Sequence, residues 1–250
     1  MPRLIPYRLA AACLLALSLT LALAAGAAAK GFRAELRVVG GGKMLAEKTL
    51  ATATTAVKTS PRADCFGPGS GGSGDSVSIP GNTALGLLAR GSKLTPSLRP
   101  LLISDHFDLG LAICGVGSGV AKGSASWYLK VNHVAPAVGG EKAKIKAGDE
   151  VLWALVKTEA PDFAYPDELA LSAPAKAQPG KPFQVRVFAY DGKGKRKPLA
   201  GAKVTGAAGP TDAAGAAQVT LSKPARLIAR FGSDIPSNRE AVCVGGKCPK

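Results

Sequence analysis

The chain has 250 residues, with 32 lysines and arginines against 17 aspartates and glutamates, and a formal net charge of +15. Aromatic residues make up only 5% of it. Because nucleic-acid surfaces normally interleave basic with aromatic residues, this balance argues against nucleic-acid binding and favours attraction to other polyanions, such as cell-wall polymers.

Residues 1–29 have the pattern of an export signal. Arg3 and Arg8 precede an apolar run over residues 9–25, and three alanines at positions 27–29 follow it. We expect cleavage after residue 29 and a mature protein that is secreted or associated with the cell envelope, with no membrane span. The alternative is a retained anchor, because the apolar run is nearly long enough to cross a bilayer.

Four cysteines remain after that cleavage, and an even number in an exported chain indicates disulfides. Three connectivities are possible, of which the pairing nearest in sequence is Cys65–Cys114 with Cys243–Cys248. In the chain-entropy model the first bridge stabilises by about 4 kcal/mol and the second by about 2 kcal/mol. Without a CxxC pair or a histidine at ligand spacing, the cysteines predict no metal site.

The first strands of the mature chain follow from its alternation of polar and apolar residues. Residues 32–40 alternate cleanly and predict a strand that turns at three glycines, Gly40 to Gly42. Residues 48–60, rich in threonine and valine, predict a second strand. Residues 61–82 are rich in glycine and serine and predict a flexible loop.

A helical period begins after this loop. Ala84, Leu87 and Leu88 fall on one helical face, Asn82 or Thr83 can cap the start, and Gly91 can end the helix. A short strand that carries Cys114 is expected next.

Two further strands are predicted around the tryptophans. In residues 126–132, Trp127 and Leu129 point to one face, while Tyr128 and Lys130 point to the other. Residues 151–156 are apolar on both faces and predict a central or covered strand. The elements up to residue 157 therefore predict a mixed sheet with one helix.

Prolines and acids in residues 158–167 predict a linker between two domains, residues 30–157 and 168–250. Beyond the linker, short β runs are separated by turns and no helical period appears. In residues 183–190 every second side chain is apolar, and the basic stretch from Asp191 to Lys197 predicts a hairpin tip. This cadence predicts an antiparallel β-sandwich.

The first domain resembles a known family in the stretches "ICGVG" and "SWYLKVNHVAPAVGGEKAKIKAGDEVLWAL". They are similar to a bacterial exported domain family of unknown function that is related to the C-terminal domain of transcobalamin and intrinsic factor, the vitamin B12 carriers. The resemblance covers about residues 32–157 and implies an α+β fold. Where many relatives have glycine after Val-Asn, this chain has His133, so the turn is expected to differ locally.

The second domain resembles bacterial immunoglobulin-like modules in the stretch "PLAGAKVTGAAGPTDAAGAAQVTL". In its Thr-Asp-x-x-Gly turn, the Asp212 carboxylate is expected to accept backbone N–H groups while Gly215 takes a positive φ. The expected fold is therefore an α+β, transcobalamin-C-like domain followed by an all-β, immunoglobulin-like sandwich.

The aromatic residues beside the predicted hairpin have two interpretations. Trp127 and Trp153 can fill the core, where a cross-strand aromatic pair stabilises by about 0.5–1 kcal/mol. Alternatively, Trp127, Tyr128, His133 and Trp153 line a ligand face, as the resemblance to B12 carriers permits. Those carriers hold cobalamin against a large helical domain that is absent here. A cobalamin or tetrapyrrole carrier is therefore kept only as the alternative function.

Catalytic signals are few. The chain has no HExxH, GxSxG or Walker motif. The tripeptide ending at Ser76 resembles the nucleophile block of one esterase class, which makes an esterase-like hydrolase a further alternative, although no Asp-x-x-His follows. Asp105, His106 and Asp108 could ligate a metal, but adjacent side chains diverge on an extended chain, so they predict a polar loop.

The sequence therefore predicts an exported, non-catalytic binding or adhesion protein of the cell envelope, without a cofactor or metal. Its expected partner is an anionic cell-wall polymer or a small hydrophobic ligand.

Overall fold

The computed structural model describes residues 31–108, 110–158, 161 and 163–249. The predicted signal peptide lies outside the described residues, and so does part of the predicted linker. The described residues from Gly31 onward form one unit. No helix in the described part of the chain is long and apolar enough to cross a membrane.

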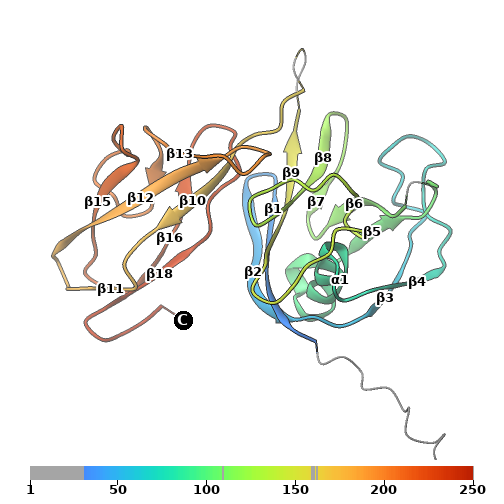
Figure 1. Cartoon of the computed structure of the whole chain (residues 1–250), viewed down its shortest axis with the longest axis horizontal. Helices are drawn as coiled ribbons and strands as arrows, with labels where there is room; N and C mark the ends of the chain where they lie inside the picture. The colour runs from blue at the N-terminus through green and yellow to red at the C-terminus, as the bar shows by residue number, and fades with distance from the viewer. Residues whose placement is uncertain (1–30, 109, 159–160, 162, 250) are drawn as a thin grey trace, which may run out of the picture. The chain divides into compact units, whose positions relative to one another are not determined.

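A four-stranded mixed sheet forms the centre of the first half, in the order β2-β1-β9-β8 (Figure 1). β1 pairs antiparallel with β2 and parallel with β9, and β9 pairs antiparallel with β8. The prediction that residues 151–156 form a central strand is confirmed, and β8 lies at the edge of the sheet. The bounds are β1 Arg33–Gly40, β2 Lys43–Ala51, β8 Ala125–Val131 and β9 Glu150–Lys157.

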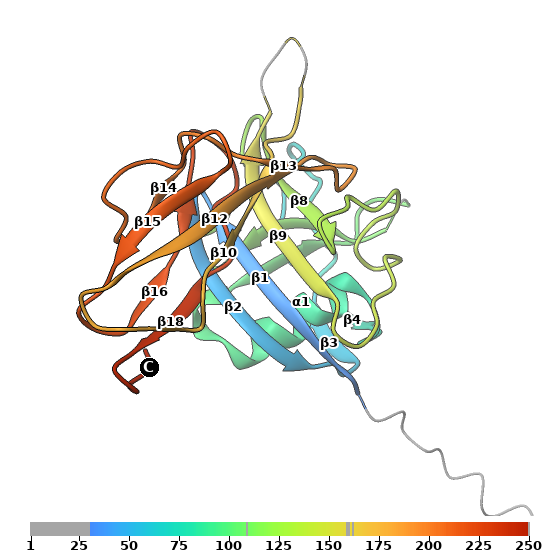
Figure 2. The ribbon, with the colours of Figure 1, turned by 60° about the vertical axis from the view of Figure 1, so that its left-hand side comes forward.

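One helix, α1 (Ala84–Leu94), packs on one face of this sheet (Figure 2). Thr83 caps its start, because the side-chain hydroxyl accepts a hydrogen bond from the Gly86 amide. The prediction that Gly91 ends the helix is wrong. A Cβ placed on Gly91 would lie 2.4 Å from a methyl carbon of Leu36, so this glycine allows α1 to approach β1 closely.

The segments around the helix differ from the expected pattern in two places. The expected single strand over residues 48–60 is divided, because β2 ends at Ala51 and β3 begins at Thr55. The expected loop over residues 61–82 contains a short strand, β4, which pairs with β3. The remaining bounds of this half are β3 Thr55–Lys58, β4 Ser76–Ile79, η1 Pro96–Leu98, β5 Leu101–Ser104, β6 Ala112–Val116 and β7 Gly119–Val120.

From Glu168 onward, the described residues form β-strands and no helix. β12 alternates as expected and buries Val185, Val187 and Ala189. The turn before β15 also has the predicted form: the Asp212 carboxylate accepts from the Ala214 and Ala216 amides. The bounds are β10 Glu168–Ser172, β11 Lys176–Ala177, β12 Pro182–Tyr190, β13 Arg196–Pro198, β14 Lys203–Val204, β15 Ala216–Thr220, β16 Ala225–Leu227, β17 Ala229–Arg230 and β18 Glu240–Val244.

The core is divided into three hydrophobic clusters. The first lies between α1 and the β1–β9 sheet, and the second lies among the strands after Glu168. The third joins Tyr128, Leu152 and Ala154 to Ile235, so the sheet face opposite α1 is also covered. This double coverage explains why β9 is apolar on both faces.

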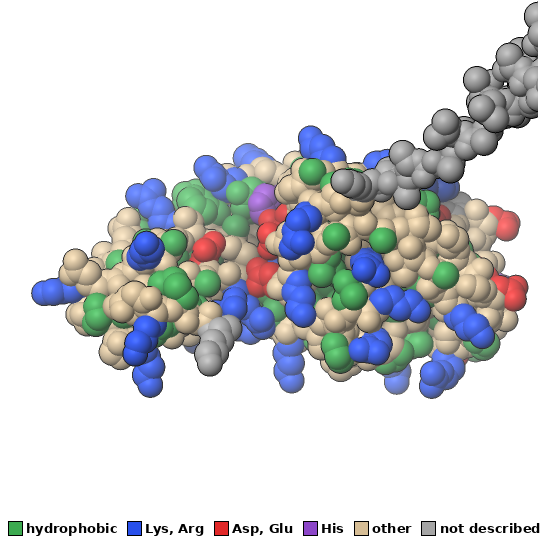
Figure 3. Space-filling view, turned by 90° about the horizontal axis from the view of Figure 1, so that it is seen from below, with side chains coloured by type: hydrophobic (Ala, Val, Ile, Leu, Met, Phe, Trp, Pro, Cys, Tyr) green, Lys and Arg blue, Asp and Glu red, His purple; other side chains and the backbone are tan. Residues whose placement is uncertain are grey.

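Basic side chains are distributed over the surface. In Figure 3, lysine and arginine side chains are scattered over the visible face and do not gather into one patch. On this face the arrangement gives a polyanion no single concentrated binding area.

Candidate ligand-binding groove

A groove of about 450 Å³ runs beside β8. Its lining contains five aromatic side chains and no charged residue: Phe66, Trp127, Tyr128, Trp153 and Tyr165. We call it the β8 groove. Pockets that hold small molecules have about this size and are mostly apolar, with volumes of roughly 300–1,000 Å³.

The groove follows the free edge of β8. Four consecutive residues, Ser126 to Leu129, line it, although their side chains point to alternate faces. The Asn132 amide donates to the Glu150 carbonyl of β9. In an antiparallel pair, the backbone N–H and C=O groups of successive residues point alternately towards and away from the partner strand. The backbone groups of Trp127 and Leu129 therefore point away from β9. Within the described ranges, no backbone hydrogen bond from another segment reaches Trp127 or Leu129 on that side.

Trp127 forms part of the groove wall and is only partly buried. Its ring packs closely on Gly119, where an added Cβ would lie 3.0 Å from a ring carbon. The indole N–H is buried and has no hydrogen-bond partner in the part of the chain that the structure describes. Trp127 is therefore fixed in position while its donor is unused.

Tyr128 and Tyr165 stack face to face, with ring centroids 4.2 Å apart and an angle of 7° between the planes. Tyr128 is buried, whereas Tyr165 is 51% exposed. The pKa of Tyr128 is raised mainly by burial of its hydroxyl, and the charges of the nearby Tyr165 and Glu168 raise it further. The hydroxyl therefore stays protonated at neutral pH. The Tyr165 ring covers one face of the Tyr128 ring.

Trp153 belongs mainly to the core. Its indole N–H donates to the Ala84 carbonyl over 3.3 Å, and only 4% of its surface is exposed. The ring packs so closely on Gly140 that an added Cβ there would lie 2.6 Å from it. Trp153 thus supports the groove from below and offers little surface to a ligand.

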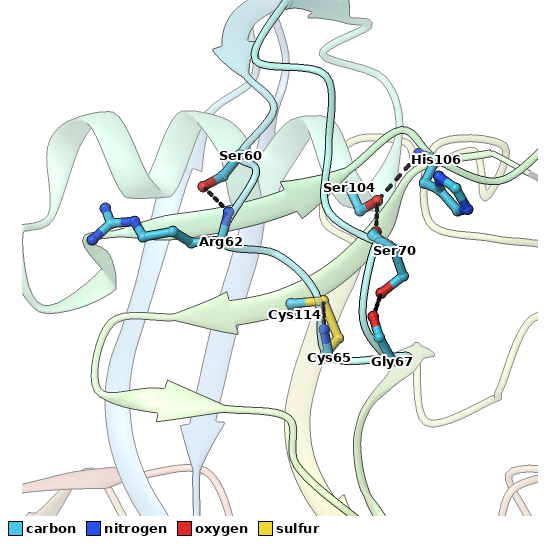
Figure 4. The surroundings of a disulfide bond; sticks show 8 residues. All are labelled: Ser60, Arg62, Cys65, Gly67, Ser70, Ser104, His106 and Cys114. Carbon is cyan, nitrogen blue, oxygen red and sulfur yellow. Dashed lines mark hydrogen bonds between the residues drawn. A yellow bond between two sulfur atoms is a disulfide. The ribbon is translucent and has the colours of Figure 1, made fainter.

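Phe66 and Tyr165 were not among the residues predicted from the sequence. Phe66 follows Cys65, whose disulfide with Cys114 ties the loop to β6 with a Cα–Cα distance of 5.5 Å (Figure 4). The Cys65 amide donates to the Cys114 sulfur, as Figure 4 shows, and Phe66 contacts Phe107 edge to face. The only feature of the sequence that could have indicated a place for Phe66 in the groove is its position next to Cys65.

His133 lies away from the groove. Its Nδ1 is 3.1 Å from the Glu168 carboxylate, and its ring stacks on Tyr190 at 3.9 Å. His133 has a φ of 69°, in the left-handed region where glycine is favoured. The turn thus places an imidazole that reaches Glu168 at a position with a left-handed backbone conformation.

Glu168 is the centre of a buried ionic cluster. Its carboxylate contacts the Arg37 guanidinium and lies 3.1 Å from the Lys130 ammonium, and all three side chains are at most 1% exposed. Arg37 also pairs with Glu150 at 2.9 Å. Burial favours the neutral form of Glu168, but the His133 hydrogen bond and the charges of Arg37 and Lys130 outweigh it and lower the pKa of Glu168.

This cluster includes three groups that could hold a cation: His133, Glu150 and Glu168, with ligand atoms within 4.8 Å of one another. The adjacent Arg37 and Lys130 already neutralise the two carboxylates. A cation would have to displace or oppose both, so the cluster fits a structural ionic network better than a metal site.

The residues considered for catalysis or for metal binding do not converge. Ser76 is exposed on β4, and no described histidine hydrogen-bonds to its hydroxyl. The Asp105 carboxylate accepts from the Ser73 amide and hydroxyl, both at 2.7 Å, whereas the His106 ring packs edge-on against Phe107.

Both disulfides of the pairing nearest in sequence are present, Cys65–Cys114 and Cys243–Cys248. They are consistent with a secreted or envelope protein. Comparisons with protein-family models, curated proteins and solved structures found no match for this chain.

Proposed function

We propose that this chain is an exported, non-catalytic binding protein of the cell envelope that holds a ligand with a flat, apolar ring in the β8 groove. The observation that carries the proposal is the set of five aromatic side chains around a groove that no charged residue lines. Each aromatic contact of this kind adds about 0.5–1.5 kcal/mol beyond the burial of its area.

The edge of β8 gives such a ligand polar contacts as well as stacking. The outward backbone groups of Trp127 and Leu129 can donate to and accept from a polar substituent. Tyr128 adds a protonated hydroxyl at the same edge. A few polar groups in an apolar pocket orient a ligand and give specificity.

Export and domain organisation complete the proposal. The signal pattern of residues 1–29 and the two disulfides support export. The first and second hydrophobic clusters lie in different parts of the chain, which fits two domains over residues 30–157 and 168–250. That the first is transcobalamin-C-like and the second an immunoglobulin-like sandwich rests on the resemblances in the sequence. In this arrangement the first domain recognises the ligand, and the second is a spacer or second contact.

The test is a titration of the mature protein, residues 30–250, with 2-naphthylmethanol, a neutral flat-ring probe, followed by tryptophan fluorescence. We expect saturable quenching, and Trp127→Ala should weaken binding at least tenfold because it removes a wall of the groove. The matched control is Phe231→Ala, which changes an aromatic residue that is 41% exposed and lies outside the lining.

Equal binding by wild type and Trp127→Ala would contradict the proposal, provided that circular dichroism shows both proteins folded. The same titration with hemin and with cobinamide tests the tetrapyrrole alternative. Binding of either with at least tenfold higher affinity than the naphthyl probe would favour that carrier.

A further inference from the structure

A basic turn borders the β8 groove. Residues 191–195 connect β12 to β13, and the Gly192 carbonyl accepts a hydrogen bond of 2.9 Å from the amide of Ala135, a groove residue. A Cβ placed on Gly192 would lie 2.9 Å from the Tyr128 hydroxyl. Lys193 pairs with Val134, the neighbour of Ala135. The turn thus lies within one residue of the groove wall.

Buried and backbone contacts hold this turn in place. The Lys130 ammonium donates to the carbonyls of Tyr190 and Asp191 over 3.1 and 2.9 Å. The Asp191 carboxylate accepts from the amides of Lys193 and Lys195, both at 2.8 Å. Because the backbone is fixed at both points, the two lysine side chains start from defined positions beside the groove.

The turn has a net positive charge that is available to a ligand. Lys193 and Lys195 are exposed, and neither side chain forms a salt bridge within the described ranges. Arg196 lies over the Phe188 ring at 4.6 Å, and Lys197 is paired with Asp167 at 3.0 Å. Asp191 offsets one charge, so an excess of positive charge remains.

One acidic group lies at the other border of the groove. The Glu141 carboxylate accepts a 2.6 Å hydrogen bond from the amide of Leu111, a groove residue. Glu141 directly follows Gly140, which also lines the groove. The groove therefore has an uncharged aromatic wall, a basic turn beside Tyr128 and an acidic group beside Leu111. This asymmetry favours one orientation of a charged ligand.

We infer that the ligand of the β8 groove is a small anion, in which an acidic group extends from the flat ring towards Lys193 and Lys195. The inference rests on the proposed function, because the ring occupies the same aromatic groove. A carboxylate, sulfonate or phosphate would satisfy the chemistry, since each accepts hydrogen bonds from ammonium groups.

The experiment compares two probes that share one ring, 2-naphthoate and 2-naphthylmethanol, at low ionic strength. We expect the mature protein to bind the carboxylate about fivefold more tightly, and added salt to reduce that preference. The Lys193→Ala/Lys195→Ala variant should lose the preference and keep its affinity for the alcohol. The control variant, Lys203→Ala/Lys223→Ala, changes two exposed lysines outside the groove and should keep both affinities.

Each outcome decides between the two proposals. Equal affinity of the wild type for both probes, or a preference that survives in Lys193→Ala/Lys195→Ala, would overturn the inference and leave the aromatic groove as a binding site. If neither probe binds, the proposed function itself fails. Circular dichroism and thermal unfolding of each variant show that lost binding does not reflect a lost fold.

Discussion

The side chain that most constrains this protein is Glu168, a carboxylate almost without exposure between two equally buried cations. Charges in such a place cost several kcal/mol to desolvate, and they are tolerated only when paired. Glu168 pairs with Arg37 from β1 and Lys130 from β8, and Lys130 in turn holds the basic turn that borders the groove. One carboxylate thereby links the position of that turn to the edge of the first sheet.

Glu168→Gln should therefore destabilise the protein by about 3–5 kcal/mol at pH 7, because it leaves the buried Lys130 without its counterion and Arg37 with Glu150 alone. The neighbouring Asp167→Asn is the control, since it breaks only the exposed pair with Lys197 and should cost at most about 1 kcal/mol. Urea unfolding of both variants measures the difference. Equal losses for the two would show that Glu168 has no special role.

We also expect the contribution of Glu168 to the free energy of unfolding to depend on pH. Folding lowers the pKa of Glu168, so its contribution to stability is complete above the pKa of an unfolded glutamate, about 4.3, and is lost as the pH falls below it. The gap in unfolding free energy between wild type and Glu168→Gln should therefore narrow below about pH 4. A gap that stays constant from pH 7 down to pH 3 would contradict the assigned network.

Among the elements, strands with a sustained local pattern were predictable, whereas the bounds of β2 and the presence of β4 were not. β1, β8 and β12 alternate over at least seven residues, and β9 contains a continuous apolar run, so local pattern alone identifies them. β4 has four residues in a stretch rich in glycine and serine, and only its pairing with β3 makes it a strand. The groove shows a similar limit. Trp127 and Tyr128 were candidates because they lie beside the predicted hairpin and the resemblance to B12 carriers permits a ligand face there, whereas Tyr165 reaches Tyr128 only through tertiary contacts.

Gly91 illustrates a local signal that tertiary packing overrides. A glycine near a helix end usually marks the end, but α1 continues to Leu94 because Gly91 faces Leu36, Leu50 and Leu98 across the core. Gly91→Ala should gain up to about 1 kcal/mol of helix propensity and lose about 1–3 kcal/mol to overpacking. We expect a net loss of stability in urea unfolding. Gly209→Ala, with no atom within 4 Å of the new Cβ, is the control and should be nearly neutral.

For the whole molecule, the groove depends on segments that are far apart in sequence. The edge of β8 supplies one wall, while Phe66 and Tyr165 come from loops before and after it. The loop with Phe66 lies next to the Cys65–Cys114 disulfide. Stability and binding are therefore expected to be coupled through this disulfide and independent of the one near the C-terminus.

Replacing both cysteines of each bridge by serine tests that coupling. Cys65→Ser/Cys114→Ser opens a bridge with a sequence separation of 49 and should lower the free energy of unfolding by about 4 kcal/mol. Cys243→Ser/Cys248→Ser opens one with a separation of 5 and should lower it by about 2 kcal/mol. Thermal or urea unfolding measures both losses. Because the first pair positions Phe66, only its variant should also bind 2-naphthylmethanol several-fold more weakly, at a temperature where both variants remain folded. Equal weakening of binding by the two variants would mean that Phe66 is not held in the groove by its neighbouring disulfide. Unchanged binding in both would mean that neither disulfide contributes to the β8 groove.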